Sequence, residues 1–166
     1  YALRIAKKLG KTKVIIQDQG GWITYKQFAV KLKLDIKELK TDYGLIIEQE
    51  LKKEVNKDSV LLINYLSGYF AEQDMDSIYS LCASNKCLLI NDISGSIGTE
   101  AAKVGDILVA SFGNDKPLNY GKGGLLAVEN KDYFTLTQIL EEDLKEDFYQ
   151  KLLDLEKRLF LLKKLT

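Results

Sequence analysis

Three side chains that could take part in chemistry follow apolar runs in the middle of the chain. Asp92 ends the run 88–92, Ser111 ends the run 106–111, and Lys116 lies a few residues further on. A carboxylate at the end of a buried strand must have a partner or lie at an exposed edge of the sheet. Taken singly, Asp92 is more typical of a turn or a helix N-cap, and Lys116 is more typical of a solvated loop.

The composition excludes several other kinds of site. The chain contains no histidine, which removes histidine-based triads, metal sites and acid–base pairs. Arg4 and Arg158 are its only arginines, so bidentate recognition of carboxylates or phosphates is limited. The 24 basic residues balance the 24 acidic ones, and this balance gives no reason to expect nucleic acid or an anionic membrane surface as a partner.

Length and cysteine usage predict one cytoplasmic protein domain. The 166 residues suffice for a single hydrophobic core, and no apolar run approaches the ~20 residues of a membrane span. No signal peptide is visible at the start. Cys82 and Cys87 each lie in an apolar segment, which is more typical of reduced core thiols than of a disulfide or a metal site.

Short β-rich runs alternate with segments of helical periodicity along most of the chain. Strands are expected at 13–16, 35–39, 59–64, 87–91, 106–110 and 125–128. Helices are expected at 2–9, 24–32, 46–55 and 74–84, and a charged, helix-like segment runs from about 131 to the end. This order predicts an α/β fold with a mostly parallel (mixed) sheet and helices on both faces.

Local features refine this arrangement. Thr24 is expected to cap the second helix. The link between 110 and 125 has four glycines, the only proline and no helical pattern, so it suits an antiparallel last strand or an excursion into a site. The run 140–165 is expected to pack on the domain or on a second subunit rather than to form a free coiled coil.

Ligands in sheets of this kind bind at the carboxyl ends of the parallel strands. Chemistry is therefore expected in the segments that follow the strands, at 17–22, 64–68, 92–98 and 111–116. We divide the chain into an α/β domain at 1–134 and a C-terminal helical extension at 135–166.

Several segments resemble one known family in their order and spacing. They are Asn-Asp-Ile-Ser-Gly-Ser-Ile-Gly at 91–98, the stretch from Val-Gly-Asp to Asn-Asp-Lys at 104–116, and Tyr-Gly-Lys-Gly-Gly followed by an apolar run at 120–128. Together with 19–25 and 64–78, they are similar to the large domain of DegT-type aminotransferases. These are fold type I enzymes that depend on pyridoxal phosphate (PLP), and many of them act on sugar nucleotides. The resemblance covers about residues 1–134 and is strongest across 88–128.

The resemblance implies a role for each candidate side chain. Lys116 would be the Schiff-base lysine, and Asp92 would hold the proton on the pyridine nitrogen of PLP. Ser111 matches a hydroxyl that touches the cofactor phosphate, and Ser94 is placed with it among the cofactor-binding residues. Trp22 would stack on the pyridine face, although a core tryptophan is an equally good reading of the same residue.

The chain also departs from this family. The phosphate cradle that precedes the first helix in the family would end where Tyr1 begins, and Gly95 lies where the family often has glutamine or histidine. The small C-terminal domain of the family is expected to be absent. The favoured hypothesis is an aminotransferase-like homodimer that acts on a small-molecule amino donor and a sugar-type acceptor. A second polypeptide that completes the site is the alternative to a second copy of the chain.

Two alternatives stay open at this point. The first is a truncated, non-catalytic relative that serves as a binding or assembly module, or as one half of a split enzyme. The second is an unrelated α/β domain whose similarity is accidental. An antiparallel strand at 125–128 separates this last alternative from the other two.

Overall fold

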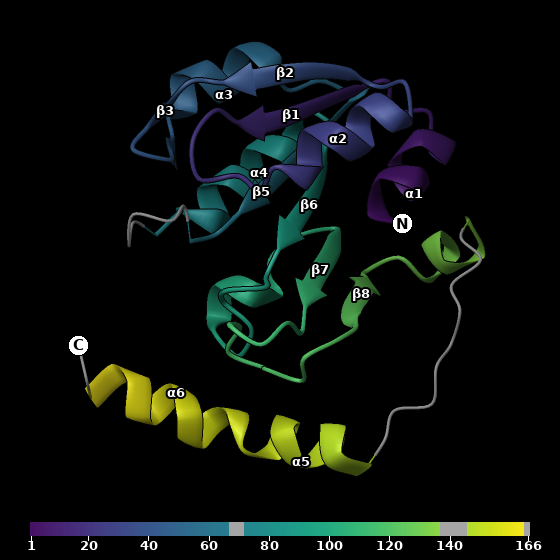
Figure 1. The fold of residues 1–166 in the computed structure, drawn as a ribbon. Coiled ribbons are helices and arrows are strands. Elements are labelled where there is room, and N and C mark those ends of the chain that lie inside the picture. The colour runs from purple at the N-terminus through teal and green to yellow at the C-terminus, as the bar shows by residue number, and fades with distance from the viewer. Residues whose placement is uncertain (67–71, 137–145, 165–166) are drawn as a thin grey trace.

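The computed structural model describes residues 1–66, 72–136 and 146–164, and a twisted sheet forms their centre (Figure 1). The strand order is β2-β1-β5-β6-β7-β8. The strands are β1 (Lys13–Gln17), β2 (Asp35–Leu39), β5 (Ser59–Asn64), β6 (Leu88–Asp92), β7 (Ile107–Ser111) and β8 (Gly124–Val128). All neighbours pair in parallel except β7 and β8, which pair antiparallel as predicted. The predicted fold class, a mostly parallel mixed sheet, is confirmed.

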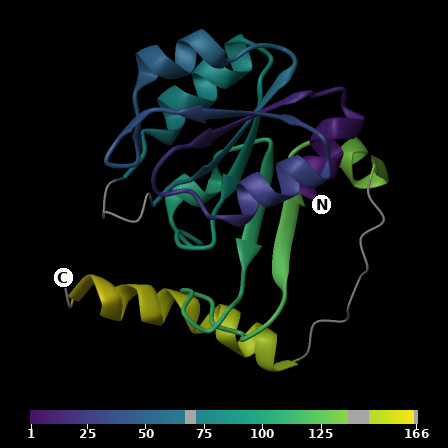
Figure 2. The same ribbon diagram turned by 45° about the horizontal axis from the view of Figure 1, so that its top comes forward.

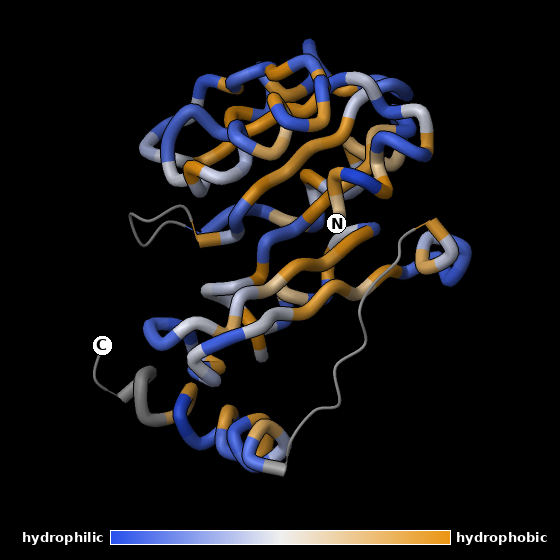
Figure 3. Tube along the Cα trace, turned by 45° about the vertical axis from the view of Figure 1, so that its right-hand side comes forward, coloured by the Kyte–Doolittle hydropathy of each residue, from blue (hydrophilic) through white to orange (hydrophobic). Residues whose placement is uncertain are grey.

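Helices cover both faces of this sheet (Figure 2). The helices are α1 (Ala2–Lys8), α2 (Thr24–Lys31), α3 (Glu48–Glu54) and α4 (Met75–Ser84). Alternate strand residues point to opposite faces. Leu62 and Ile90 belong to the core under α1 and α2, whereas Leu61 and Leu89 belong to the core under α3 and α4. Figure 3 shows the hydrophobic residues concentrated along these strands.

Helix α4 shows how local sequence sets an element's limits. The Asp74 carboxylate accepts a hydrogen bond from the Ser77 amide at 3.1 Å, which is an N-cap. At the other end Lys86 takes a left-handed conformation (φ 55°), and the Cys87 amide donates to the Cys82 carbonyl at 2.9 Å. This is a Schellman ending. Both cysteines are free and buried, as predicted for core thiols.

One predicted helix start and one predicted helix cap are wrong. Helix α3 begins at Glu48 rather than at residue 46, because β4 (Leu45–Ile46) pairs with β3 (Thr41–Asp42) in a small hairpin. Tyr43 and Gly44 between them both have positive φ, as the tightest hairpin turn requires. Thr24 is the first residue of α2, whose N-cap position makes no side-chain cap.

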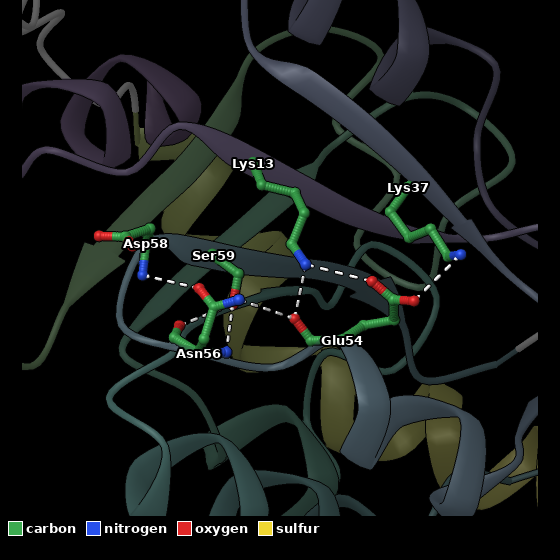
Figure 4. Close-up of polar contacts among 6 residues, drawn as sticks. All are labelled: Lys13, Lys37, Glu54, Asn56, Asp58 and Ser59. Atoms are coloured by element: carbon green, nitrogen blue, oxygen red, sulfur yellow. Dashed lines mark hydrogen bonds and ion pairs between the residues drawn. The ribbon is translucent and has the colours of Figure 1, made fainter.

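A network of charged and polar side chains fixes α3 at the amino ends of the strands (Figure 4). Lys13 Nζ donates to the Glu54 carbonyl at 2.7 Å and to its Oε2 at 3.1 Å, and Lys37 Nζ lies 3.0 Å from Oε1. The hydrogen bond from Lys37, followed by that from Lys13, holds the pKa of Glu54 below its ordinary value of 4.5. This network lies at the end of the sheet opposite to the carboxyl ends, so we read it as structural.

The C-terminal part of the chain contains a 3-10 helix, η2 (Lys131–Leu136), and two α-helices, α5 (Glu146–Leu153) and α6 (Leu155–Lys164). Helices α5 and α6 lie across the end of the sheet where β7 ends and β8 begins, whereas η2 lies beside α1 (Figure 1). Phe148 is buried between Phe112 and Tyr120, with ring centroids 5.2 and 5.3 Å away. The extension therefore packs on its own domain, and residues 137–145 and 165–166 lie outside the described part. The proposed domain boundary after residue 134 falls within η2.

Candidate active site

A cavity of about 660 Å³ opens at the carboxyl ends of the central strands, beneath α1 and α2. Its apolar floor comes from strands β5, β6 and β7, through Leu62, Ile90 and Val109. Its other lining residues come from α1 and α2, from the ends of β6 and β7, and from the segments next to these elements, namely Tyr1, Ala2, Leu3, Arg4, Trp22, Thr24, Tyr25, Phe28, Lys31, Leu32, Asp92, Ser94, Ala110 and Ser111. Four of the five predicted site residues therefore surround one space.

Asp92 is the carboxylate of this cavity. Its Oδ2 accepts a hydrogen bond from the Tyr25 hydroxyl at 2.5 Å, and its Oδ1 accepts one from the Ser94 amide at 3.0 Å. The second bond makes Asp92 a turn aspartate, as one reading of the sequence had it. The helical segment that follows, η1 (Glu100–Lys103), begins too far away for Asp92 to be its N-cap. The Asp92 side chain therefore both stabilises a turn and contributes a carboxylate to the cavity.

The two predicted serines link the strand ends to each other. The Ser111 amide donates to Ser94 Oγ at 2.8 Å, and the Gly113 amide donates to Ser111 Oγ at 3.3 Å. These bonds hold the loop after β6 against the end of β7. The Ser111 residue is exposed, so its hydroxyl is accessible to a ligand in the cavity.

Lys116 lies at the rim of the cavity rather than in its lining. Its Nζ stands 5.7 Å from the centroid of the Trp22 ring, within reach of a cation–π contact. Trp22 is 63% exposed and lines the cavity, so the reading of Trp22 as a core residue is wrong. The indole is largely exposed, and the lysine amine stands over its ring.

The loop that carries Lys116 is closed by backbone hydrogen bonds. The Gly121 amide donates to the Phe112 carbonyl at 2.7 Å, and the Phe112 amide donates to the Gly123 carbonyl at 3.1 Å. Gly121 has φ +88°, and a Cβ on Gly124 would lie 2.3 Å from the Ala110 carbonyl oxygen. Glycine is therefore required at both positions, which accounts for the glycine-rich turn after the lysine.

Tyr25 is a site residue that the sequence did not reveal. It lies within the segment 19–25 that resembles the family, where only Trp22 is assigned a role, and its hydroxyl meets a carboxylate 67 positions away along the chain. Nothing in its local pattern signals that contact. Arg4 also lines the cavity, with its guanidinium 5.7 Å from the centroid of the Tyr1 ring.

A comparison with protein families matches residues 2–150 to the DegT/DnrJ/EryC1/StrS aminotransferase family. The chain belongs to this family. The match covers most of the sequence, so the accidental-similarity alternative is excluded. A comparison with curated proteins finds none that matches.

Solved structures of the same fold include several other proteins. One is NtdA from Bacillus subtilis with bound cofactor PMP, at 19% identity, with 81% of this chain and 32% of that chain covered and a TM-score of 0.66. Another is an aminotransferase from Psychrobacter cryohalolentis, at 20% identity, 81% and 37% coverage, and a TM-score of 0.63. A third is a sphingosine-1-phosphate lyase from Burkholderia pseudomallei, at 10% identity, 81% and 35% coverage, and a TM-score of 0.65.

These similarities establish the fold, but the fold alone does not determine which reaction the protein catalyses. A lyase shares it with aminotransferases, so reaction class depends on the family and on the site. This DegT-family chain spans about a third of the length of each of these three proteins. None of the described helices has both the length and the apolar character that a membrane crossing needs.

Pyridoxal phosphate is the cofactor of the DegT family, and the cofactor prediction is confirmed at that level. The residues present fit this group. The cavity offers a carboxylate acceptor at Asp92, a hydroxyl at Ser111 and an exposed indole at Trp22, with the Lys116 amine beside that indole. These protein groups would meet, in that order, the pyridine nitrogen, the phosphate, the flat ring and the aldehyde carbon of PLP.

Proposed function

We propose that this DegT-family chain supplies the lysine-and-aspartate part of a PLP-dependent aminotransferase site. The observation that carries the proposal is the gathering of Asp92, Ser94, Ser111 and Trp22 around one cavity, with the Lys116 amine 5.7 Å from the indole ring. When bound, PLP supplies an electron sink for the carbon from which a proton is removed.

Asp92 and Lys116 would do the proton work. The Asp92 carboxylate would hold a proton on the pyridine nitrogen, because an anionic acceptor favours the charged form of a ring that it faces. The Lys116 amine would hold the cofactor covalently and, when free, would carry a proton to or from the substrate carbon. The closed loop from Phe112 to Gly123 supports Lys116 with backbone hydrogen bonds on both sides.

Ser94, Ser111 and Trp22 would bind and orient the cofactor. The Ser111 hydroxyl at the exposed end of β7 suits a phosphate oxygen, and Ser94 fixes the position of Ser111 through the 2.8 Å bond to its amide. The exposed Trp22 ring would cover one face of the pyridine and exclude water from it.

The acceptor is proposed to be of sugar type. Hydroxyl groups of Thr24, Ser94 and Ser111 line the cavity and suit a hydroxyl-rich substrate. The scarcity of arginine in the sequence supported this idea, but Arg4 does line the cavity, so one guanidinium is available to an anionic group. The amino donor and acceptor are small molecules, and nothing in the charge balance favours nucleic acid.

A homodimer is proposed as the working form, with a second, different polypeptide as the alternative partner. Tyr1, Trp22 and Phe28 line the cavity and are 57%, 63% and 53% exposed. A large apolar surface at the mouth of a site is typical of a protein interface. Sedimentation equilibrium measures the assembly state directly. The cytoplasmic location stays a prediction.

A second candidate is a non-catalytic binding or assembly module, or one half of a split enzyme. The observation that favours it is that Lys116 lies outside the lining of the cavity. Such a protein would bind the cofactor in this cavity but would transfer no amino group.

One experiment separates the two candidates. The protein is loaded with PLP and mixed with amino acids as donors, and the PMP that forms is measured by mass spectrometry. PMP should form in the parent protein and in Lys122→Ala, whose lysine is exposed in the same loop, but not in Lys116→Ala. Retention of PLP without any PMP in the parent would contradict the aminotransferase proposal and favour the binding module.

A further inference from the structure

Tyr25 joins helix α2 to the carboxylate of the candidate site. Its hydroxyl donates to Asp92 Oδ2 at 2.5 Å, a length typical of hydrogen bonds from a hydroxyl to a carboxylate. The tyrosine is 7% exposed and belongs to the hydrophobic core under α1 and α2. Both residues line the cavity, so this contact lies inside the site rather than on the surface.

The surroundings of Tyr25 fix the ring in this position. The Tyr25 amide donates to the Trp22 carbonyl at 2.9 Å, which ties the tyrosine to the turn that carries the indole. A Cβ on Gly21 would lie 3.4 Å from the ring carbon Cδ2, so the turn also bounds the ring from the side. Tyr25 therefore connects the two residues proposed to meet the cofactor ring, Trp22 and Asp92.

The direction of the hydrogen bond is set by the environment. Burial, then the charge of Asp92 and the hydrogen bond to it, raise the pKa of the Tyr25 phenol well above its ordinary value of 10. The phenol thus keeps its proton and is the donor. Asp92 Oδ1 accepts a hydrogen bond from the Ser94 amide. Each carboxylate oxygen thus accepts one such bond from the described part of the protein and can accept a second one from a ligand.

We infer that Tyr25 is a positioning residue for Asp92, whose phenol holds the carboxylate in one orientation. This inference rests on the proposed function. A carboxylate fixed in this way would keep its negative charge facing the pyridine nitrogen of a bound cofactor, and that charge favours the protonated ring. The cofactor ring would then stay in its cationic, electron-withdrawing form. Without the phenol, the carboxylate would turn away more readily, and the ring would lose its proton more easily.

The test uses Tyr25→Phe, which removes one oxygen from a core ring. Tyr79→Phe is the matched control, because the Tyr79 hydroxyl also donates to carboxylates, Glu129 at 3.1 Å and Asp106 at 3.4 Å, but borders a different cavity. Circular dichroism and the unfolding midpoint establish that each variant is folded. Asp92→Asn serves as a second variant in which the hydroxyl keeps a neutral acceptor.

The first readout needs no cofactor. Proton NMR should show a slowly exchanging, downfield phenolic proton in the parent and in Tyr79→Phe, because a buried phenol on a carboxylate exchanges slowly. The signal should be absent in Tyr25→Phe and moved upfield in Asp92→Asn. If the parent shows no signal that Tyr25→Phe removes, the pairing of Tyr25 with Asp92 is overturned.

The second readout uses PLP labelled with ¹⁵N at the pyridine nitrogen. In Tyr25→Phe the nitrogen resonance should move toward that of the unprotonated ring, and the Kd for PLP should rise about tenfold, while Tyr79→Phe matches the parent. An unchanged resonance in Tyr25→Phe would overturn the inference and leave the proposed function standing. If the parent binds no PLP at all, the proposed function fails along with the role toward pyridine, and the phenolic proton still decides the pairing.

Discussion

Phe148 offers a quantitative test of how the C-terminal helices are attached to the lysine loop. Its ring is 6% exposed and lies against Phe112 and Tyr120, the residues that flank the loop with Lys116. Truncation of a buried phenylalanine to alanine costs about 3–5 kcal/mol, and this includes the loss of two aromatic contacts worth about 0.5–1.5 kcal/mol each. We therefore expect Phe148→Ala to weaken the docking of α5 by about 3 kcal/mol.

The assay must separate detachment of the helices from unfolding of the sheet. Hydrogen exchange resolved by peptide should show faster exchange in α5 and α6 and at the Gly121 amide, which closes the lysine loop. The free energy of urea unfolding of the α/β part should change less, because α5 can detach while the sheet stays folded. Leu153→Ala is the control, since Leu153 is 71% exposed in the same helix as Phe148, and should shift stability by under ~0.5 kcal/mol.

Equal effects of the two substitutions would refute this account of the docking. So would unchanged exchange in α5 of Phe148→Ala, because that result means that Phe148 does not anchor the helix. A loss of protection confined to the strands would place the role of Phe148 in the sheet instead.

Three further predictions concern the scaffold. The lysine partners that hold the pKa of Glu54 below 4.5 stabilise the fold above that pH, and this contribution disappears as the pH falls through the lowered pKa. Glu54→Gln should therefore lower the free energy of urea unfolding by about 1 kcal/mol at pH 7 and leave it unchanged near pH 2. An equal loss at both pH values would contradict a role for the ion pairs. Gly124→Ala should cost about 2–3 kcal/mol because its Cβ would lie 2.3 Å from a carbonyl oxygen, whereas Gly113→Ala, with 3.6 Å to its nearest atom, should be nearly neutral by the same measurement. Lys86→Gly should raise the thermal midpoint by a few degrees, since glycine removes about 1 kcal/mol of strain at φ 55°; a lower midpoint would refute this.

The sheet could be predicted from the sequence because its strands are uninterrupted apolar runs between helical segments. The strand predicted at 59–64 has the same bounds in the structure, because its continuous apolar pattern suits few elements other than a buried strand. The β3–β4 hairpin was missed because strands of two residues are too short to show periodicity. The exposure of Trp22 could not be predicted, because an aromatic residue beside a glycine turn suits either a core or a binding surface.

The site was predicted in part for a similar reason. Asp92 and Ser111 end strands whose carboxyl ends meet at one edge, so the parallel topology brings them to one cavity. Lys116 depends on a loop whose course follows from glycine conformations and from the docked helix α5, and sequence alone gives neither. The Tyr25–Asp92 bond depends on the packing of α2 on the sheet, which no local pattern encodes.

Borohydride reduction of the PLP-loaded protein, followed by peptide mass mapping, identifies the lysine that binds the cofactor. Borohydride converts a Schiff base into a stable secondary amine, so the modified lysine is read from the peptide masses. We expect a single pyridoxyl adduct on Lys116, lost in Lys116→Ala and retained in Lys122→Ala. An adduct on another lysine of the folded parent, or no adduct on Lys116 while PLP is bound, would contradict Lys116 as the Schiff-base lysine.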